Sequence, residues 1–139
     1  MTAYVIQAAA DCVRPGGRVA FNYLIPDFRE DGPLYAMVSG ENKPPLSPPL
    51  WDEKGLNGLI AKTGLMKVKG DTRKTTWPID VIEGFYLVPA MSNSLFPKME
   101  YPQRKERVEK LFSELREKGV SEMEQAWNRV YCVKPEVNR

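Results

Sequence analysis

Histidine is absent from all 139 residues of the chain. Imidazole is the side chain that titrates nearest neutral pH, and it activates the nucleophile in Ser-His and Cys-His catalytic sites. Its absence excludes those sites, together with metal sites that need an imidazole ligand. Asp, Glu, Lys and Tyr could still carry acid–base chemistry, but none of them stands in a catalytic motif. We therefore expect a non-catalytic protein that has no catalytic residues and needs no cofactor.

Cysteine is scarce, because Cys12 and Cys132 are the only two. A structural zinc site takes four Cys or His ligands, so these two residues cannot form one. They belong to no C-x-x-C pattern and lie near opposite ends of the sequence. Free, buried thiols are the favoured interpretation, and a disulfide bridge between the two ends remains open. No metal site is predicted.

Long apolar runs are also missing. A helix that crosses a bilayer needs about 20 apolar residues, and no run in this sequence approaches that length. The first residues, MTAYVIQAAADC, lack the basic head and the continuous apolar stretch of a signal peptide. These features predict a soluble, cytoplasmic protein with no membrane partner.

The composition is that of an ordinary globular domain. Apolar residues make up 42% and charged residues 27% of the chain, and the net charge is +2. That charge is too small to indicate nucleic-acid binding by itself. The length fits a single α+β domain over residues 1–139, and a chain of this size buries enough surface to form a core without metals or disulfides.

Local patterns predict the elements of the first half. Three consecutive alanines favour a helix over residues 2–13, although the run Tyr-Val-Ile could equally begin a strand. Residues 18–25 alternate apolar and polar side chains, which predicts a strand, and residues 34–38 are its expected hairpin partner. A proline-rich loop at 39–52 then leads into a short helix over 53–63.

In the second half, residues 65–69 and 72–77 flank Gly70-Asp71, which predicts an exposed hairpin. Residues 79–88 are rich in β-branched and aromatic side chains, as in a central strand.

Two helices are expected at the C-terminal end. Val108, Leu111, Phe112 and Leu115 form an apolar stripe on a helix that begins near Pro102. Ser121 and Glu124 match a capping box for a second helix. The predicted fold is therefore α+β, with a mainly antiparallel sheet of four or five strands and a helical hairpin at 102–131 packed on one face.

The stretch KPPLSPPLW at 43–51 contains a P-x-x-P pair, Pro45 and Pro48. Such segments bind the grooves of proline-recognising domains, but those ligands also need a basic residue at a set distance, and Lys43 is one position too close. A structural loop is the favoured interpretation, with Leu46, Leu50 and Trp51 packed on the sheet. A loop with exposed apolar tips that binds a partner is the alternative.

Basic residues gather in the predicted hairpin at 62–77, where the only acid is Asp71. Cations follow a phosphate backbone, and an aromatic ring can stack on an unpaired base, so the segment is the best candidate for binding nucleic acid or a nucleotide. A solvated edge kept soluble by lysines, or a site for an acidic protein, would look the same. The candidate residues are Lys62, Lys67, Lys69, Arg73, Lys74 and Trp77.

The leading hypothesis is a binding protein that acts through a protein partner or as a homo-oligomer. Trp127 and Tyr131 are more often core residues at such positions, but on a projecting helix they would anchor an interface. The candidate protein-binding residues are Leu46, Leu50, Trp51, Trp127 and Tyr131. The alternative is nucleic-acid or nucleotide binding through residues 62–77.

Overall fold

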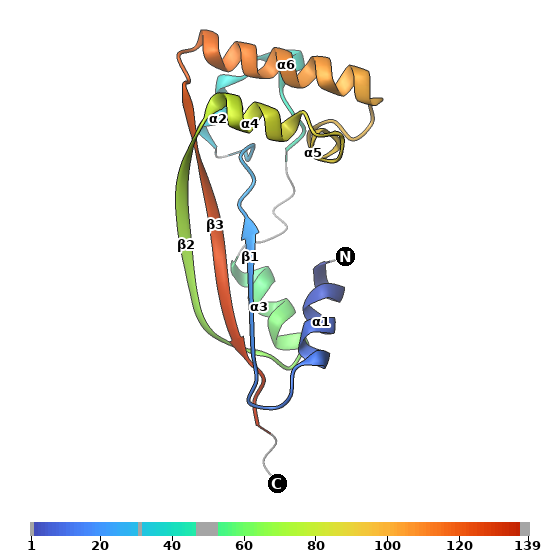
Figure 1. Ribbon diagram of the computed structural model, residues 1–139, viewed down its shortest axis with the longest axis vertical. Coiled ribbons are helices and arrows are strands. Elements are labelled where there is room, and N and C mark those ends of the chain that lie inside the picture. Colours follow the sequence, from blue (N-terminus) through green and yellow to red (C-terminus); the bar gives the residue numbers. More distant parts are fainter. Residues whose placement is uncertain (1, 31, 47–52, 137–139) are drawn as a thin grey trace. The chain divides into compact units, whose positions relative to one another are not determined.

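The computed structural model describes residues 2–30, 32–46 and 53–136 (Figure 1). The contacts between residues divide the chain into two compact units. The first, here the sheet unit, comprises Met1–Ile25, Pro49–Arg73 and Ala126–Arg139. The second, the helical unit, comprises Pro26–Pro48 and Lys74–Gln125. That the chain is a single domain over residues 1–139 stays a prediction.

The sheet is antiparallel and has three strands in the order β1-β3-β2 among the described residues. The strands are β1 (Arg18–Leu24), β2 (Met66–Pro78) and β3 (Glu122–Val133). β3 is the central strand, and β1 and β2 therefore run parallel to each other on either side of it. The sheet unit contains all of β1, β2 up to Arg73 and β3 from Ala126 onward.

Two helices cover one face of the sheet unit. They are α1 (Thr2–Cys12) and α3 (Glu53–Lys62), and Figure 1 shows both on the same side of the strands. Both helices were predicted from the sequence, and so was β1. The core that they close consists of Ile6, Ala10, Leu56, Ile60, Leu65, Val130 and Cys132.

The helical unit contains α2 (Pro33–Met37), a 3-10 helix η1 (Gly40–Asn42), α4 (Ile79–Tyr86), α5 (Pro89–Leu95) and α6 (Tyr101–Glu117). The predicted stripe on α6 is confirmed, since Val108, Leu111, Phe112 and Leu115 have no exposed surface. Gly119 ends the helix with φ at 84°, a backbone conformation that favours glycine, and the Val120 N–H then donates to the Leu115 carbonyl at 3.0 Å.

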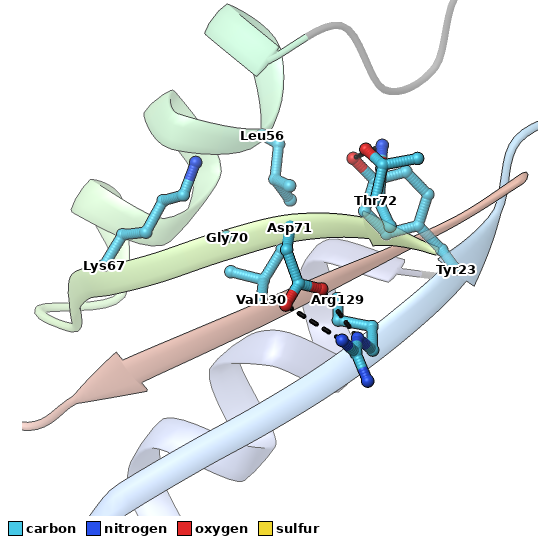
Figure 2. Close-up of a pocket in the computed structure, with 9 residues that line it drawn as sticks. Tyr23, Leu56, Lys67, Gly70, Asp71, Thr72, Arg129 and Val130 are labelled. Atoms are coloured by element: carbon cyan, nitrogen blue, oxygen red, sulfur yellow. Dashed lines mark hydrogen bonds and ion pairs between the residues drawn. The ribbon is translucent and has the colours of Figure 1, made fainter. Parts of the chain in front are cut away.

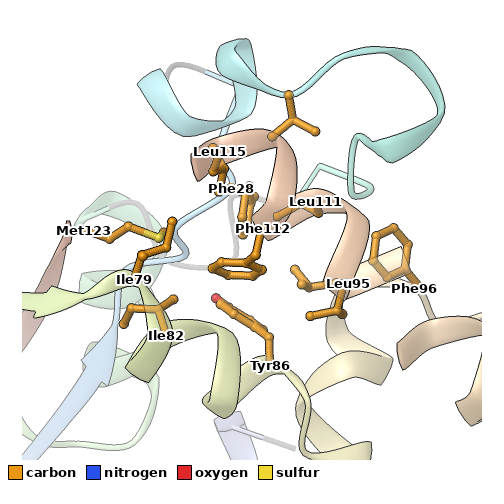
Figure 3. Close-up of a cluster of buried hydrophobic side chains, with 12 residues drawn as sticks. Phe28, Ile79, Ile82, Tyr86, Leu95, Phe96, Leu111, Phe112, Leu115 and Met123 are labelled. Atoms are coloured by element: carbon orange, nitrogen blue, oxygen red, sulfur yellow. The ribbon is translucent and has the colours of Figure 1, made fainter. Parts of the chain in front are cut away.

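Aromatic side chains form the centre of this unit's core (Figure 3). The ring centroid of Phe112 lies 6.1 Å from that of Tyr86, and Tyr86 in turn lies 6.0 Å from Phe28. Aliphatic residues of α4, α5 and α6 surround these rings. The buried members are Phe28, Val38, Ile79, Ile82, Tyr86, Leu95, Phe96, Val108, Leu111, Phe112, Leu115 and Met123.

One carboxylate is built into the edge of this core. Asp27 accepts hydrogen bonds from the Tyr86 hydroxyl at 2.8 Å and from the Gln125 amide at 3.2 Å, both at Oδ2. Burial raises the pKa of Asp27 above its ordinary value of 3.8, and the two hydrogen bonds oppose that rise. Burial and the charge of Asp27 also raise the pKa of Tyr86.

Polar side chains of α6 hold the segment that follows α2. Glu114 accepts a hydrogen bond from the Ser39 N–H at 2.5 Å and one from the Asn42 amide at 3.1 Å. The hydrogen bonds from Ser39 are the largest cause of the lowered pKa of Glu114, which falls to about 2. Arg107 and Lys118 donate to the carbonyls of Glu41 and Met37. Side chains of α6 therefore hold η1 in place through hydrogen bonds to its backbone and to the Asn42 side chain.

Two predicted strands are helices. Residues 34–38 lie mostly in α2, because Pro33 occupies a first-turn position where its missing N–H costs nothing. Residues 79–88 begin with α4, whose buried residues Ile79, Ile82 and Tyr86 have helical spacing. The β-branched composition of this segment pointed to a strand, but its spacing is that of a helix.

The predicted hairpin at 62–77 and the predicted helix after Ser121 are also wrong. Residues 66–78 form one continuous strand, since β2 stays paired with β3 across Gly70-Asp71. Residues 122–133 form β3, so the C-terminal region has a strand where a helical hairpin was expected. The sheet accordingly has three strands and not four or five. Long-range pairing overrides the local capping signal at Ser121 and Glu124.

Truncation of the central ring tests the core of the helical unit. Phe112→Ala should lower the free energy of unfolding by about 3–5 kcal/mol, because it leaves a cavity among fully buried side chains. The neighbouring, exposed Ser113 provides the control, and Ser113→Ala should change stability by no more than about 0.5 kcal/mol. Urea denaturation measures both. Equal stabilities for the two variants would contradict the core described here.

The buried carboxylate predicts a pH dependence of stability. A folded-state pKa above 3.8 means that the folded protein holds the Asp27 proton more tightly than the unfolded chain. Stability is therefore fully present below 3.8 and falls as the pH rises through the folded pKa. Asp27→Asn should remove this fall, and Tyr86→Phe should move it to higher pH, because it deletes a hydrogen bond that lowers the pKa. Denaturation of all three proteins across acidic to neutral pH measures it, and identical profiles would refute the assignment.

Candidate protein-binding surface

The two faces of the sheet unit differ in what covers them. Residues paired across antiparallel strands share a face, and successive residues alternate. The pairs Val19↔Cys132 and Phe21↔Val130 belong to the face covered by α1 and α3. The pairs Arg18↔Val133, Ala20↔Tyr131 and Asn22↔Arg129 therefore form the opposite face, here called the outer face.

The outer face carries an apolar hollow of about 470 Å³. Val68 and Tyr131 contribute apolar surface to it and are 63% and 38% exposed. Ala20 is exposed between longer side chains and leaves room there because its side chain is a single methyl group. The lining residues are Arg18, Ala20, Val68, Lys69, Tyr131 and Val133, together with Val19 and Cys132, whose side chains lie on the covered face. The two charged members of this set, Arg18 and Lys69, are both cations.

Strand β1 lies at an edge of the sheet, and its register shows which backbone groups are unpaired. The Ile25 N–H donates to the Ala126 carbonyl at 2.8 Å, and the Lys134 N–H donates to the Gly17 carbonyl at 2.9 Å. Odd-numbered residues of β1 therefore bond to β3, and the even-numbered residues direct N–H and C=O away from it. Within the described residues, no strand pairs with that side of β1. The even-numbered residues are Arg18, Ala20, Asn22 and Leu24.

The two edges of the sheet are protected differently. On β2, the part within the sheet unit carries Lys67, Lys69, Asp71 and Arg73, and charges of this kind discourage pairing with another strand. Strand β1 has the sequence RVAFNYL, in which Arg18 is the only charge. The edge of β1 is therefore the one suited to strand addition.

A second, polar pocket of about 270 Å³ lies elsewhere on the sheet unit (Figure 2). Beside it, Arg129 donates two hydrogen bonds to the carboxylate of Asp71, at 2.6 and 2.9 Å, which join β3 to β2. The hydrogen bonds from Arg129 lower the pKa of Asp71. The Thr72 hydroxyl donates to Asn128 at 2.7 Å, and the Asn128 amide donates to the Tyr23 hydroxyl at 2.8 Å. These polar side chains form hydrogen bonds with one another and so link the three strands of the sheet.

The predicted protein-binding residues fall on different units. Leu46 is 44% exposed and belongs to the helical unit, whereas Leu50 and Trp51 lie outside the described residues. Trp127 and Tyr131 lie on β3 and not on a helix. They belong to the sheet unit, where Trp127 is half-buried opposite Leu24 and Tyr131 lies on the outer face.

The predicted nucleic-acid residues are spread out as well. Lys62 is in the last turn of α3, and Lys67, Lys69 and Arg73 lie on the part of β2 within the sheet unit.

Lys74 and Trp77 belong to the helical unit. Lys74 pairs with Glu124 at 3.2 Å, and the Trp77 indole donates to the Thr75 hydroxyl at 3.1 Å. The assignment of this set to nucleic acid stays a prediction.

A further apolar surface lies on α4. Val81 and Phe85 are 49% and 41% exposed, and Val88 just beyond the helix is 48% exposed, at helical spacing. Their neighbours Asp80 and Glu83 both pair with Arg116 of α6. The two acids beside this surface therefore share one cation.

The described residues also bear on thiol chemistry, metal binding and membrane insertion. Cys132 is buried as expected, Cys12 is exposed, and both are free thiols. No group of three or more Cys, Asp or Glu side chains there could hold a metal ion. Every helix in the same ranges is too short or too polar to span a bilayer.

The sequence matches no family model and no curated protein. The candidate surface is therefore identified from the geometry of the sheet unit. Sequence analysis named two of its residues, Tyr131 as a candidate for protein binding and Lys69 as a candidate for nucleic-acid binding, and missed Arg18, Ala20 and Val68. The alternation of residues 18–25 does contain a signal for the outer face, because Ala20 and Asn22 fall between the apolar positions Val19, Phe21 and Tyr23.

Neighbouring residues of β3 test the assignment of the two faces. Val130 is buried under the helices, so Val130→Ala should lower the free energy of unfolding by about 2 kcal/mol. Tyr131 lies on the outer face, so Tyr131→Ser should change it by less than about 1 kcal/mol despite the larger truncation. Chemical denaturation measures both variants. A greater loss for Tyr131→Ser would show that the outer face is covered.

Proposed function

We propose that this protein is a binding module whose protein partner adds a strand to the edge of β1 and covers the outer face. The observation that carries the proposal is the β1 edge itself. Its even-numbered residues offer an unpaired row of N–H and C=O groups with almost no charge to repel another strand. Strand addition uses such main-chain hydrogen bonds for affinity and neighbouring side chains for specificity.

The composition of the outer face supports the same proposal. An antiparallel sheet can leave one face to solvent, and the side chains of that face are then usually polar. In the described residues, α1 and α3 cover one face and leave apolar side chains of the outer face exposed. A partner that extends the sheet and covers this face would complete it.

A second copy of the chain could also supply the strand. Two β1 edges can pair around a two-fold axis, which makes self-association an alternative form of the same proposal. Both forms need the unpaired backbone groups of β1, so one variant tests both.

Nucleic-acid binding is the weaker candidate. Of the cations on β2 and β3, Lys74 pairs with Glu124 and Arg129 with Asp71. Opposite charges this close cancel much of the attraction that phosphate would otherwise feel. Binding to nucleic acid should also fall steeply with salt, whereas strand addition depends mainly on uncharged backbone groups.

Asn22→Pro tests strand addition with little effect on the fold. Proline removes the N–H that points to the free edge and keeps the ladder to β3 intact, since residue 22 does not bond to β3. Asn22→Ala is the matched control, because it changes the same side chain and keeps the N–H. Circular dichroism should show the same folded structure for all three proteins.

The measurement compares affinity purification from the source cells with sedimentation of each purified protein. We expect wild type and Asn22→Ala to retain the same partner, or to self-associate, with Asn22→Pro weaker by about tenfold or more. Undiminished binding by folded Asn22→Pro would contradict the proposal. So would a wild-type protein that retains no partner and remains monomeric.

A further inference from the structure

We infer that the segment covering the outer-face hollow is an amphipathic helix of the partner, with acidic residues beside its apolar stripe. The inference rests on the proposed function, because it names the chemistry of what the partner places on the outer face. It concerns the side chains of that face, whereas strand addition concerns the backbone of β1. Either the helix on the outer face or strand addition to β1 can therefore be wrong while the other is right.

The apolar lining of the hollow suits a helix. Sheets pack against helices through apolar side chains that stand on the strands, and the outer face has such side chains on all three strands. Ala20 lies on β1, Val68 on β2, and Tyr131 and Val133 on β3. The volume of about 470 Å³ is large enough to hold several apolar side chains. A row of two or three aliphatic side chains from one helix face would occupy it.

The charges around the hollow favour acidic flanks. Arg18 and Lys69 line the hollow from opposite edge strands, and none of the lining residues in the described part of the chain is acidic. The nearby Arg129 already binds Asp71, so its charge is balanced within the sheet. Charge complementarity across an interface selects partners and suppresses wrong ones. A helix with Glu or Asp on both sides of its apolar stripe would place acids near both cations.

The side chains favour a helix over single-stranded nucleic acid. Proteins that bind unpaired bases do so on several aromatic side chains in succession. Among the described residues, Tyr131 is the only aromatic one that lines the hollow, and most of the other lining residues are aliphatic. Aliphatic surface between two cations fits an acidic amphipathic helix better than a row of bases.

A charge swap tests the inference on the full chain. The probes are two synthetic amphipathic helices of about 18 residues, or five turns, with the same leucine stripe and either Glu or Lys on both flanks. Fluorescence anisotropy measures binding of each labelled peptide. We expect wild type to bind the Glu-flanked peptide about tenfold more tightly than the Lys-flanked one, and the double variant Arg18→Glu/Lys69→Glu to reverse the preference.

The matched control is Lys54→Glu/Lys62→Glu. It changes the net charge by the same amount at exposed positions of α3 that do not line the hollow. The control should keep the wild-type preference. A preference that shifts equally in both double variants, or no peptide binding by wild type, would overturn the inference.

Two further variants separate this inference from strand addition. Ala20→Leu fills the hollow and should weaken the peptide about tenfold, whereas Asn22→Pro should leave peptide binding unchanged. If Asn22→Pro abolishes partner binding while the peptides do not bind, strand addition stands and the helix is wrong. Displacement of the Glu-flanked peptide by a single-stranded oligonucleotide, with tighter binding of the oligonucleotide, would also overturn the inference.

Discussion

The register between β1 and β3 determines the character of the whole sheet unit. Opposing residues in this ladder share a face, so the pairing of Phe21 with Val130 sends both side chains under α1 and α3. The same pairing sends Ala20 and Tyr131 to the outer face and turns the backbone of Ala20 toward the free edge. A slip by one residue would reverse every one of these directions. The core, the hollow and the unpaired edge are thus three consequences of one set of hydrogen bonds.

The two units are stabilised in different ways. The helical unit buries the apolar stripe of α6 completely, together with aromatic rings that pack in the same core. Polar contacts fix η1 to the same helix. The sheet unit buries one face only. It retains an edge strand that is nearly uncharged, and natural proteins usually protect such edges with charges, as this sheet does on β2. The β1 edge and the outer face are therefore a part of the described chain where another polypeptide would cover both unpaired backbone groups and apolar side chains.

Local signals in the sequence predicted the elements whose structure is set locally. The alanines of residues 8–10, the alternation of residues 18–25 and the stripe from Val108 to Leu115 all led to the correct element. The failures occurred where distant partners decide. Ser121 and Glu124 form a plausible helix start, but residues 122–133 pair with β1 and β2 from distant parts of the chain and become a strand. For α4, composition suggested a strand although the spacing of Ile79, Ile82 and Tyr86 was helical. The candidate surface was missed for the same reason, since Ala20, Val68 and Tyr131 meet only through the non-local pairing of β3.

Residue-resolved amide hydrogen exchange tests the central claim most directly. In the monomeric protein, at a concentration too low for self-association, the amides of Val19, Phe21 and Tyr23 should exchange slowly, because they bond to β3, and those of Ala20, Asn22 and Leu24 should exchange rapidly. This alternation along β1 requires both the register and the free edge. Equally slow exchange at all six amides would mean that the edge is already paired. Slow exchange at the even-numbered amides alone would mean that the register, and with it the outer face, is wrong.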